Sequence, residues 1–231
     1  MPNTIHLKKS AGLLKIVLLL CIIFISACKS QVVAPKAEAP PNEIKKLLIL
    51  PFQDMSSLYG ENASVRCDLC GKVFATGRVE KGAGELLTEH LIALMKNQTG
   101  FELLSGSTAR SVRSDLISGK HVEISELDLV RETGRDLGAD GVMVGHLYRF
   151  IERNGNRLSV ESPASVTFDI DLIRVADGAV IWGGSFDETQ RSLFEDLFKL
   201  DQFLKRKGGW VTAEELGVLG LESLVEKLPK P

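Results

Sequence analysis

The apolar segment near the amino terminus constrains this chain more than any other feature of its sequence. Residues 1–15 carry three lysines and no acidic residue, and residues 16–25 are almost entirely apolar. This apolar run is shorter than the ~20 residues that a helix needs to cross a bilayer. A basic start, a short apolar core and the small residues Ser26 and Ala27 are typical of a cleaved signal peptide, which we assign to residues 1–27.

A cysteine, Cys28, follows this segment directly. The sequence Ile-Ser-Ala-Cys at 25–28 resembles the lipobox of bacterial lipoproteins. That resemblance implies cleavage before Cys28 and lipid attachment to its thiol and to the new amino terminus. Lys29 stands where an inner-membrane lipoprotein would carry a retention aspartate, so the resemblance implies the periplasmic face of the outer membrane. The alternatives are an uncleaved anchor and plain secretion with a chance cysteine.

The composition separates a tether from a single folded domain. Residues 28–43 comprise the lipidated cysteine and a stretch with three prolines and no apolar periodicity, which predicts a flexible, extended tether. Residues 44–231 have a length that suits one periplasmic domain. Hydrophobic residues make up 44% of the whole chain, which is enough for a packed core.

The charge balance argues against a nucleic-acid partner. The formal net charge is −2, and it becomes −5 once the three lysines, the only charged residues in positions 1–27, leave with the signal peptide. An acidic chain without a basic cluster lacks the electrostatic footprint of a protein that binds nucleic acid or an anionic lipid surface. We therefore expect contact with the membrane only through Cys28.

Hydrophobic periodicity predicts an α/β (α+β) domain with a mixed β-sheet flanked by helices. The expected strands lie at 47–50, 101–104, 141–151, 166–172 and 179–182, and the expected helices at 83–96, 107–117, 125–137 and 212–228. Asp177-Gly178 is the strongest hairpin signal, and Thr212 with Glu215 forms a capping box. Between the first strand and the first helix, residues 53–82 read as a long loop, and loops of that length are often functional.

Four segments, at 49–52, 82–91, 137–145 and 170–182, together resemble the α/β fold shared by CsgG, LpoB and the amino-terminal domain of TolB. The resemblance implies a non-catalytic protein that binds envelope or secretion partners, as a homo-oligomer in many of its members. No run of alternating residues is long enough to supply the membrane hairpins of a secretion channel. The resemblance brings no catalytic residues and no cofactor.

Cys67 and Cys70 are the two cysteines left in the mature domain, and they form a Cys-x-x-Cys pair. Half of a zinc-finger pattern is present, but no histidine pair follows at finger spacing. A thioredoxin-type site would place the pair at the start of a helix, whereas Gly71 and a β-prone stretch follow. In an exported protein we therefore expect a local disulfide and no metal. The alternative is a lipid-anchored enzyme or a redox or metal protein that uses these two cysteines.

Other polar residues give no catalytic constellation. His90 lies between Leu87 and Leu94 in the helix at 83–96, where we expect a packed or boundary histidine rather than a ligand. His146 is expected to share a strand face with Tyr148. Asp169 and Asp171 lie on one face of an alternating strand, which we interpret as the solvent face rather than an acid/base pair. Since the sequence contains no nucleophile, phosphate or zinc-protease motif, we expect no enzymatic activity.

Two stretches are poorly explained by core packing, the 53–82 loop and the segment from 193 to 210. The second contains several apolar residues beyond what a short helix buries, and we select Phe203 and Trp210 from it as interface residues. The expected partners are envelope or secretion proteins, or a second copy of the chain.

The lipid-anchor interpretation predicts that Cys28→Ser blocks maturation, because the lipid is attached to the missing sulfur. Fractionation and mass spectrometry should show an unlipidated, unprocessed precursor. Cys21→Ser is the matched control, since Cys21 lies inside the apolar segment, and this variant should mature normally. A Cys28→Ser protein that still matures and fractionates with the outer membrane would contradict the assignment.

Overall fold

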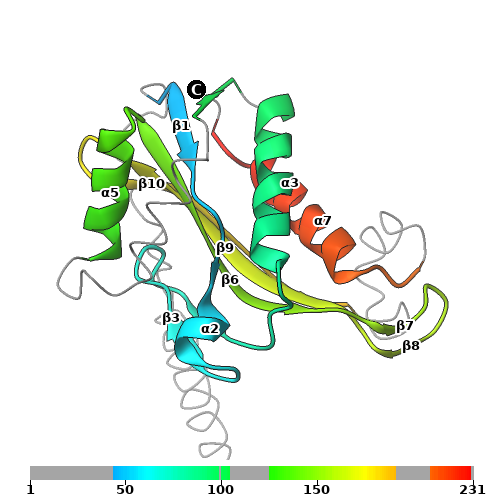
Figure 1. Ribbon diagram of the computed structural model, residues 1–231. Helices are drawn as coiled ribbons and strands as arrows, with labels where there is room; N and C mark the ends of the chain where they lie inside the picture. The colour runs from blue at the N-terminus through cyan, green and yellow to red at the C-terminus, as the bar shows by residue number, and fades with distance from the viewer. Residues whose placement is uncertain (1–43, 99, 105–124, 191–208, 230–231) are drawn as a thin grey trace, which may run out of the picture. The chain divides into compact units, whose positions relative to one another are not determined.

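The computed structural model describes residues 44–98, 100–104, 125–190 and 209–229 (Figure 1). These residues all belong to Ala37–Pro231, the second of two units into which the chain divides. The predicted signal peptide, the tether, the expected helix at 107–117 and the candidate interface residue Phe203 lie outside the described residues.

The core of the fold is a mixed sheet, as the sequence predicts, in the strand order β10-β9-β6-β1-β5 with β2 pairing β6. Its strands are β1 (Lys46–Ile49), β2 (Gln53–Asp54), β5 (Glu102–Leu103), β6 (Gly141–Ile151), β9 (Ser165–Arg174) and β10 (Val180–Thr189). Strand β1 is parallel to both β5 and β6, whereas β6-β9 and β9-β10 are antiparallel. Parallel pairing is concentrated at the end of the sheet that contains the crossover helices, and hairpins build the other end.

One face of the sheet is covered by two helices, α3 (Ala83–Gln98) and α7 (Ala213–Val225), which contact each other (Figure 1). The largest hydrophobic cluster lies between these helices and the sheet. It includes Leu87 and Leu91 from α3, Leu216 and Leu221 from α7, and Phe168, Ile170 and Leu172 from β9. Burial of this apolar surface is the main stabilising contribution to the domain.

The opposite face of the sheet is covered in two parts (Figure 1). Helix α5 (Glu126–Asp136) packs Val130 against Val142, Val144 and Ile173. A smaller cluster, formed by Met55, Val65, Cys67, Phe74 and Tyr148, joins residues 53–76 to β6. Because both faces are covered, every residue of β9 is buried. The predicted solvent face of this strand, with Asp169 and Asp171, is therefore wrong.

Residues 53–76, which we call the β3–β4 unit, contain regular secondary structure, although the sequence predicts a long loop over residues 53–82. The unit contains β2, the short helix α2 (Met55–Tyr59), and a two-stranded hairpin of β3 (Ser64–Arg66) and β4 (Val73–Ala75). Asp54 caps α2 by accepting hydrogen bonds from the backbone nitrogens of Ser56 and Ser57. These elements are too short to give a periodic signal in the sequence, and Tyr148, which stacks on Phe74 at 4.3 Å between ring centroids, helps to hold the unit in place.

Several local signals in the sequence lead to the expected structures. Ser125 caps α5, and Gly138 follows that helix with a positive φ of 69°. The Thr212–Glu215 capping box opens α7 with both of its hydrogen bonds formed. At the β9–β10 hairpin, Gly178 has a φ of 78°, a conformation that residues with a Cβ rarely adopt. Such signals depend only on neighbouring residues, which explains why the sequence reveals them.

A second small hairpin, of β7 (Asn154–Gly155) and β8 (Val160–Ser162), extends beyond the sheet and α7 (Figure 1). The turn between the two strands is held by Asn156, whose side chain accepts hydrogen bonds from the backbone nitrogens of Leu158 and Ser159. None of the helices in the described part of the chain combines the length and the apolar character required to span a bilayer.

Close packing at Gly145 on β6 gives a test of the core. A Cβ at this position would lie 2.5 Å from the ring of Phe52, which itself makes an edge-to-face contact with Phe168. Gly145→Ala should therefore lower the free energy of unfolding by about 1–3 kcal/mol, as overpacking generally does. Urea denaturation measures this change.

The double variant Gly145→Ala/Phe52→Leu is the control for this mechanism. A smaller side chain at position 52 leaves room for the added methyl group, so the two substitutions should cost less together than the sum of their separate effects. Strict additivity would contradict the proposed steric conflict.

Candidate functional site

A buried cluster of sulfur and carboxylate groups lies where the β3–β4 unit meets the sheet. The cysteines come from the turn between β3 and β4, and the carboxylates come from the middle of β9. The cluster consists of Cys67, Cys70, Asp169 and Asp171, and one ligand atom from each side chain lies within 4.8 Å of all the others. The hairpin thus brings together residues about a hundred positions apart in the chain.

The cysteines sit in a tight turn rather than at the start of a helix. The backbone nitrogen of Cys70 donates a hydrogen bond to Cys67 Sγ at 3.1 Å, and the backbone nitrogen of Cys67 donates to the carbonyl of Lys72 at 2.8 Å. Gly71 follows with a φ of 71°, which the reversal of the chain requires. The sequence argues against a thioredoxin-type site, and the turn geometry agrees, because the pair does not begin a helix.

Both cysteines are free thiols, and each one faces a carboxylate. Cys67 Sγ lies 3.8 Å from Asp171 Oδ2, and Cys70 Sγ lies 3.5 Å from Asp169 Oδ2. The expected disulfide is therefore not formed in this structure, and its formation under oxidising conditions stays a prediction. Cys67 is almost fully buried, whereas Cys70 is partly accessible.

Asp169 is well supported by its neighbours although it is only 1% exposed. His146 Nδ1 lies 2.8 Å from Asp169 Oδ1, and the hydroxyl of Tyr148 donates to Asp169 Oδ2 at 3.0 Å. Burial alone would raise the pKa of this carboxyl, but the hydrogen bond and the positive charge of His146 lower the pKa below its ordinary value. Asp169 is therefore an anion held in place by two side chains of β6.

Asp171 lies in a different environment, although it is two residues away on the same strand. Its side chain is 0% exposed, and Oδ1 has no hydrogen-bond partner among the described residues. Burial, followed by the charge of Asp169, raises the pKa of Asp171 to about 7. A buried carboxylate whose one donor is the weak thiol of Cys67 is costly when charged, so the charged form of this residue needs a compensating partner.

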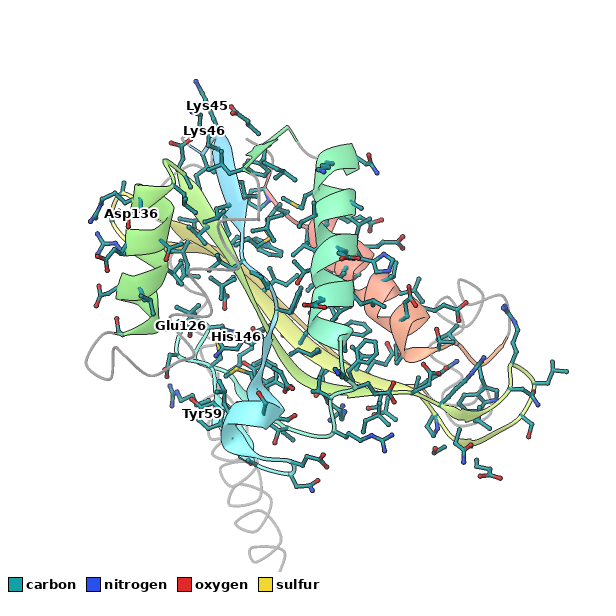
Figure 2. The ribbon with its side chains drawn as sticks, in the orientation of Figure 1. Lys45, Lys46, Tyr59, Glu126, Asp136 and His146 are labelled. Atoms are coloured by element: carbon teal, nitrogen blue, oxygen red, sulfur yellow. The ribbon has the colours of Figure 1, made fainter. Side chains whose placement is uncertain are left out.

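His146 is held between two carboxylates. Besides its contact with Asp169, its Nε2 lies 2.8 Å from Oε1 of Glu126, the first residue of α5 (Figure 2). Burial opposes the charged form of the imidazole, but the hydrogen bonds to Asp169 and Glu126 outweigh it and raise the pKa of His146 well above its ordinary value. His146 is therefore a buried imidazolium that links α5 to β9.

The two thiols differ in acidity. The hydrogen bond between their side chains is the largest cause of the difference, and it lowers the pKa of Cys70 while it raises that of Cys67. Cys70, which is also the more accessible thiol, is the sulfur that first becomes a thiolate. A thiolate is the form that reacts with electrophiles and binds metals.

The sequence identified most of these residues without joining them. Cys67 and Cys70 were interpreted as a disulfide, Asp169 and Asp171 as solvent-facing, and His146 as sharing a face with Tyr148, which the structure confirms. Glu126 was missed as a partner of His146. The alternation of a strand shows that Asp169 and Asp171 share a face, but it cannot show that the β3–β4 hairpin covers that face. His90 packs elsewhere, on the surface of α3, with Nε2 3.0 Å from Glu214 Oε1.

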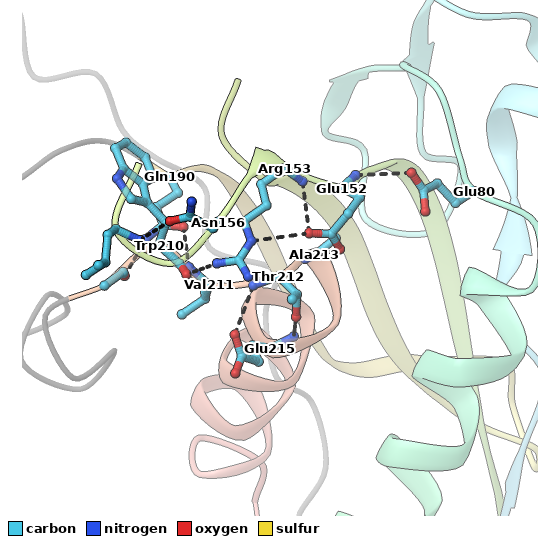
Figure 3. Close-up of polar contacts among 12 residues, drawn as sticks. Glu80, Glu152, Arg153, Asn156, Gln190, Trp210, Val211, Thr212, Ala213 and Glu215 are labelled. Carbon is cyan, nitrogen blue, oxygen red and sulfur yellow. Dashed lines mark hydrogen bonds and ion pairs between the residues drawn. The ribbon is translucent and has the colours of Figure 1, made fainter. Parts of the chain in front are cut away.

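Trp210 is partly exposed and is attached through its backbone (Figure 3). Its nitrogen donates to the carbonyl of Arg157 at 3.0 Å, and the guanidinium of Arg153 donates to its carbonyl. Gln190 accepts a hydrogen bond from the backbone nitrogen of Val211. The approach to α7 is thus fixed by polar contacts, and the indole of Trp210 is not part of the buried core.

Large apolar side chains are exposed at four described positions. Three of them, Leu58, Tyr59 and Val73, belong to the β3–β4 unit. The fourth, Leu158, is 90% exposed and lies in the loop that joins β7 to β8. Exposed aromatic and aliphatic side chains are common in protein interfaces, and three of these four gather on the same small unit that carries the two cysteines.

No family model matches the chain, and no curated protein sequence matches it either. Solved structures with a similar arrangement include the PelC dodecamer from Paraburkholderia phytofirmans, at 12% identity and a TM-score of 0.46, covering 82% of this chain and 90% of that one. The LpoB C-terminal domain from Escherichia coli is 18% identical with a TM-score of 0.38, covering 66% of this chain and 88% of that one. Lipoprotein GNA1162 from Neisseria meningitidis is 12% identical with a TM-score of 0.40, covering 71% and 96%.

The position of His146 between two carboxylates gives a stability prediction. His146→Leu should lower the free energy of unfolding by about 3–5 kcal/mol, because it leaves Asp169 and Glu126 without their shared cation. His90→Leu is the matched control, and it should cost less than about 1 kcal/mol, since His90 pairs with Glu214 at an exposed position. Urea denaturation of both variants tests this expectation. Equal losses would show that the buried pairing contributes nothing specific.

Proposed function

We propose that this chain is a non-catalytic lipoprotein, anchored through Cys28 at the periplasmic face of the outer membrane, whose α/β domain binds a protein of the cell envelope or of a secretion assembly. The observation that carries the proposal is the sequence Ile-Ser-Ala-Cys at 25–28, after a short apolar segment and before a proline-containing stretch. A domain on a tether of this kind can reach a partner some distance from the membrane.

The β3–β4 unit is the surface that we favour for partner binding. It contributes three of the four exposed large apolar side chains of the described residues. Its base is fixed to the sheet through Phe74 and Tyr148, so the exposed residues are presented on an ordered support. A pre-ordered surface loses less conformational entropy on association than a flexible one.

The sequence suggests a second candidate surface, for which we selected Phe203 and Trp210. Trp210 is partly exposed, and its backbone is held by Arg153 and Arg157. Tryptophan is enriched among residues that dominate binding energy. Self-association through this segment would give the homo-oligomer that the sequence resemblance suggests.

Photocrosslinking in intact cells tests these assignments. A photoreactive residue at Tyr59 or Val73 should trap an envelope protein, and one at Trp210 should trap either the same partner or a second copy of the chain. The control position is Glu132, which is exposed on α5 and belongs to neither surface. Mass spectrometry of the crosslinked species then identifies the partner.

The outcomes of this experiment are distinct. Crosslinks at Tyr59 or Val73 but not at Glu132 would support the β3–β4 unit as the binding surface. A crosslink at Trp210 alone would move the binding surface to the second segment. Equal labelling at all positions, or none at any of them, would contradict a specific binding role for this domain.

A further inference from the structure

We infer that Cys67, Cys70, Asp169 and Asp171 bind a zinc ion that joins the β3–β4 unit to the central sheet. This inference goes beyond the proposed function and does not depend on it, because a metal could fasten the fold whether or not a partner binds. It also departs from the disulfide that the sequence suggested.

The types of the four ligands favour zinc over other abundant divalent cations. Two sulfur and two oxygen donors suit Zn²⁺, which takes cysteine and carboxylate ligands in tetrahedral sites. Magnesium and calcium prefer all-oxygen sites with more ligands, and thiolates select against them. The cluster therefore offers the number of donors that a four-coordinate zinc ion takes, and each donor atom is of a type that zinc binds.

The distances between the ligand atoms are close to those of such a site. Bond lengths of about 2.3 Å to sulfur and 2.0–2.2 Å to oxygen place tetrahedral ligand atoms about 3.3–3.8 Å apart. The contact from Cys70 to Asp169 is 3.5 Å, and that from Cys67 to Asp171 is 3.8 Å. Since no pair of ligand atoms in the cluster is more than 4.8 Å apart, a small contraction of the side chains would complete the geometry.

Asp171 supplies a second, independent observation. Its side chain is fully buried, one oxygen faces Cys67, and the other finds no hydrogen-bond donor among the residues the structure describes. Gly183 on β10 leaves the space for this carboxylate, because a Cβ there would lie 2.3 Å from Asp171 Oδ1. Oδ2 is the oxygen on the side of the cysteines, and a cation bound there would neutralise the charge of a buried carboxylate that the protein satisfies only in part.

The surroundings hold the other ligands in position. The backbone nitrogen of Cys70 donates to Cys67 Sγ, and this hydrogen bond fixes the position of that sulfur. His146 and Tyr148 hold Asp169, as the outer shells of metal sites commonly hold ligating carboxylates. Cys70 is partly accessible and provides an entry for the ion.

Binding would release protons and lock two parts of the fold together. Zn²⁺ replaces the thiol protons of Cys67 and Cys70, which pass to the solvent, and no electron is transferred. The ion would then connect the β3–β4 turn to β9, two segments about a hundred residues apart. As thiolates bound to zinc, the cysteines would also be protected from forming a disulfide with each other.

The test uses the full chain, purified in detergent and reduced, with added zinc or cobalt and no chelator. Elemental analysis should find about one zinc per chain, and Co²⁺ should produce the absorption bands of a tetrahedral ion with thiolate ligands. Cys70→Ser and Asp171→Asn should each weaken zinc binding at least about tenfold. Asp68→Asn is the matched control, because Asp68 is an exposed carboxylate in the same turn, and it should bind zinc as the unmodified chain does.

Asp171→Asn keeps the size of the side chain, so it also separates loss of the ligand from loss of the fold; circular dichroism of each variant confirms that comparison. The inference is overturned if the reduced chain binds no zinc at micromolar concentrations. It is also overturned if Cys70→Ser and Asp171→Asn bind zinc as tightly as Asp68→Asn, or if bound Co²⁺ shows no thiolate ligation. If the reduced chain binds no zinc, the predicted disulfide would remain the expected state of Cys67 and Cys70.

Discussion

The antiparallel pairing of β6 with β9, buried on both faces, is the constraint on which the rest of this domain depends. The register runs from Gly141 opposite Arg174 to Ile151 opposite Ser165, with one irregularity between Leu147 and Arg149. Strands covered on one face alone can alternate apolar and polar residues freely. Here both faces need a cover: α3 and α7 supply one, and α5 with the β3–β4 unit supplies the other.

Polar residues on the second face of β9 must then be satisfied within the protein. Asp169 forms hydrogen bonds with His146 and Tyr148 of the neighbouring strand, and His146 is stabilised in turn by Glu126 at the start of α5. Such a network is costly if any member is missing, and it ties three separate elements to one arrangement. Asp171, at the edge of the network and beside Cys67, is the one carboxylate that the described residues leave incompletely satisfied.

The β3–β4 unit therefore has two sides with different properties. Its inner side carries Cys67, Val65 and Phe74, which pack on the sheet, and its outer side exposes Tyr59 and Val73. Whatever fixes the inner side also fixes the orientation of the outer one. A metal at the cysteine turn and a partner on the exposed side would then act on the same element.

The sequence by itself determined the features that depend on near neighbours or on regular periodicity. These include the mixed α/β class, the bounds of β6, the cap of α5 at Ser125, the capping box at Thr212 and the turn at Gly178. Tertiary structure alone decided that Asp169 and Asp171 are buried. Alternation along a strand shows that two residues share a face, but not whether another element covers that face. Cys67 and Cys70 likewise acquired carboxylate neighbours only when a hairpin too short to leave a periodic signal folded over the sheet. The physical reason is the same in both cases, since contacts between residues about a hundred positions apart are set by packing and not by local propensity.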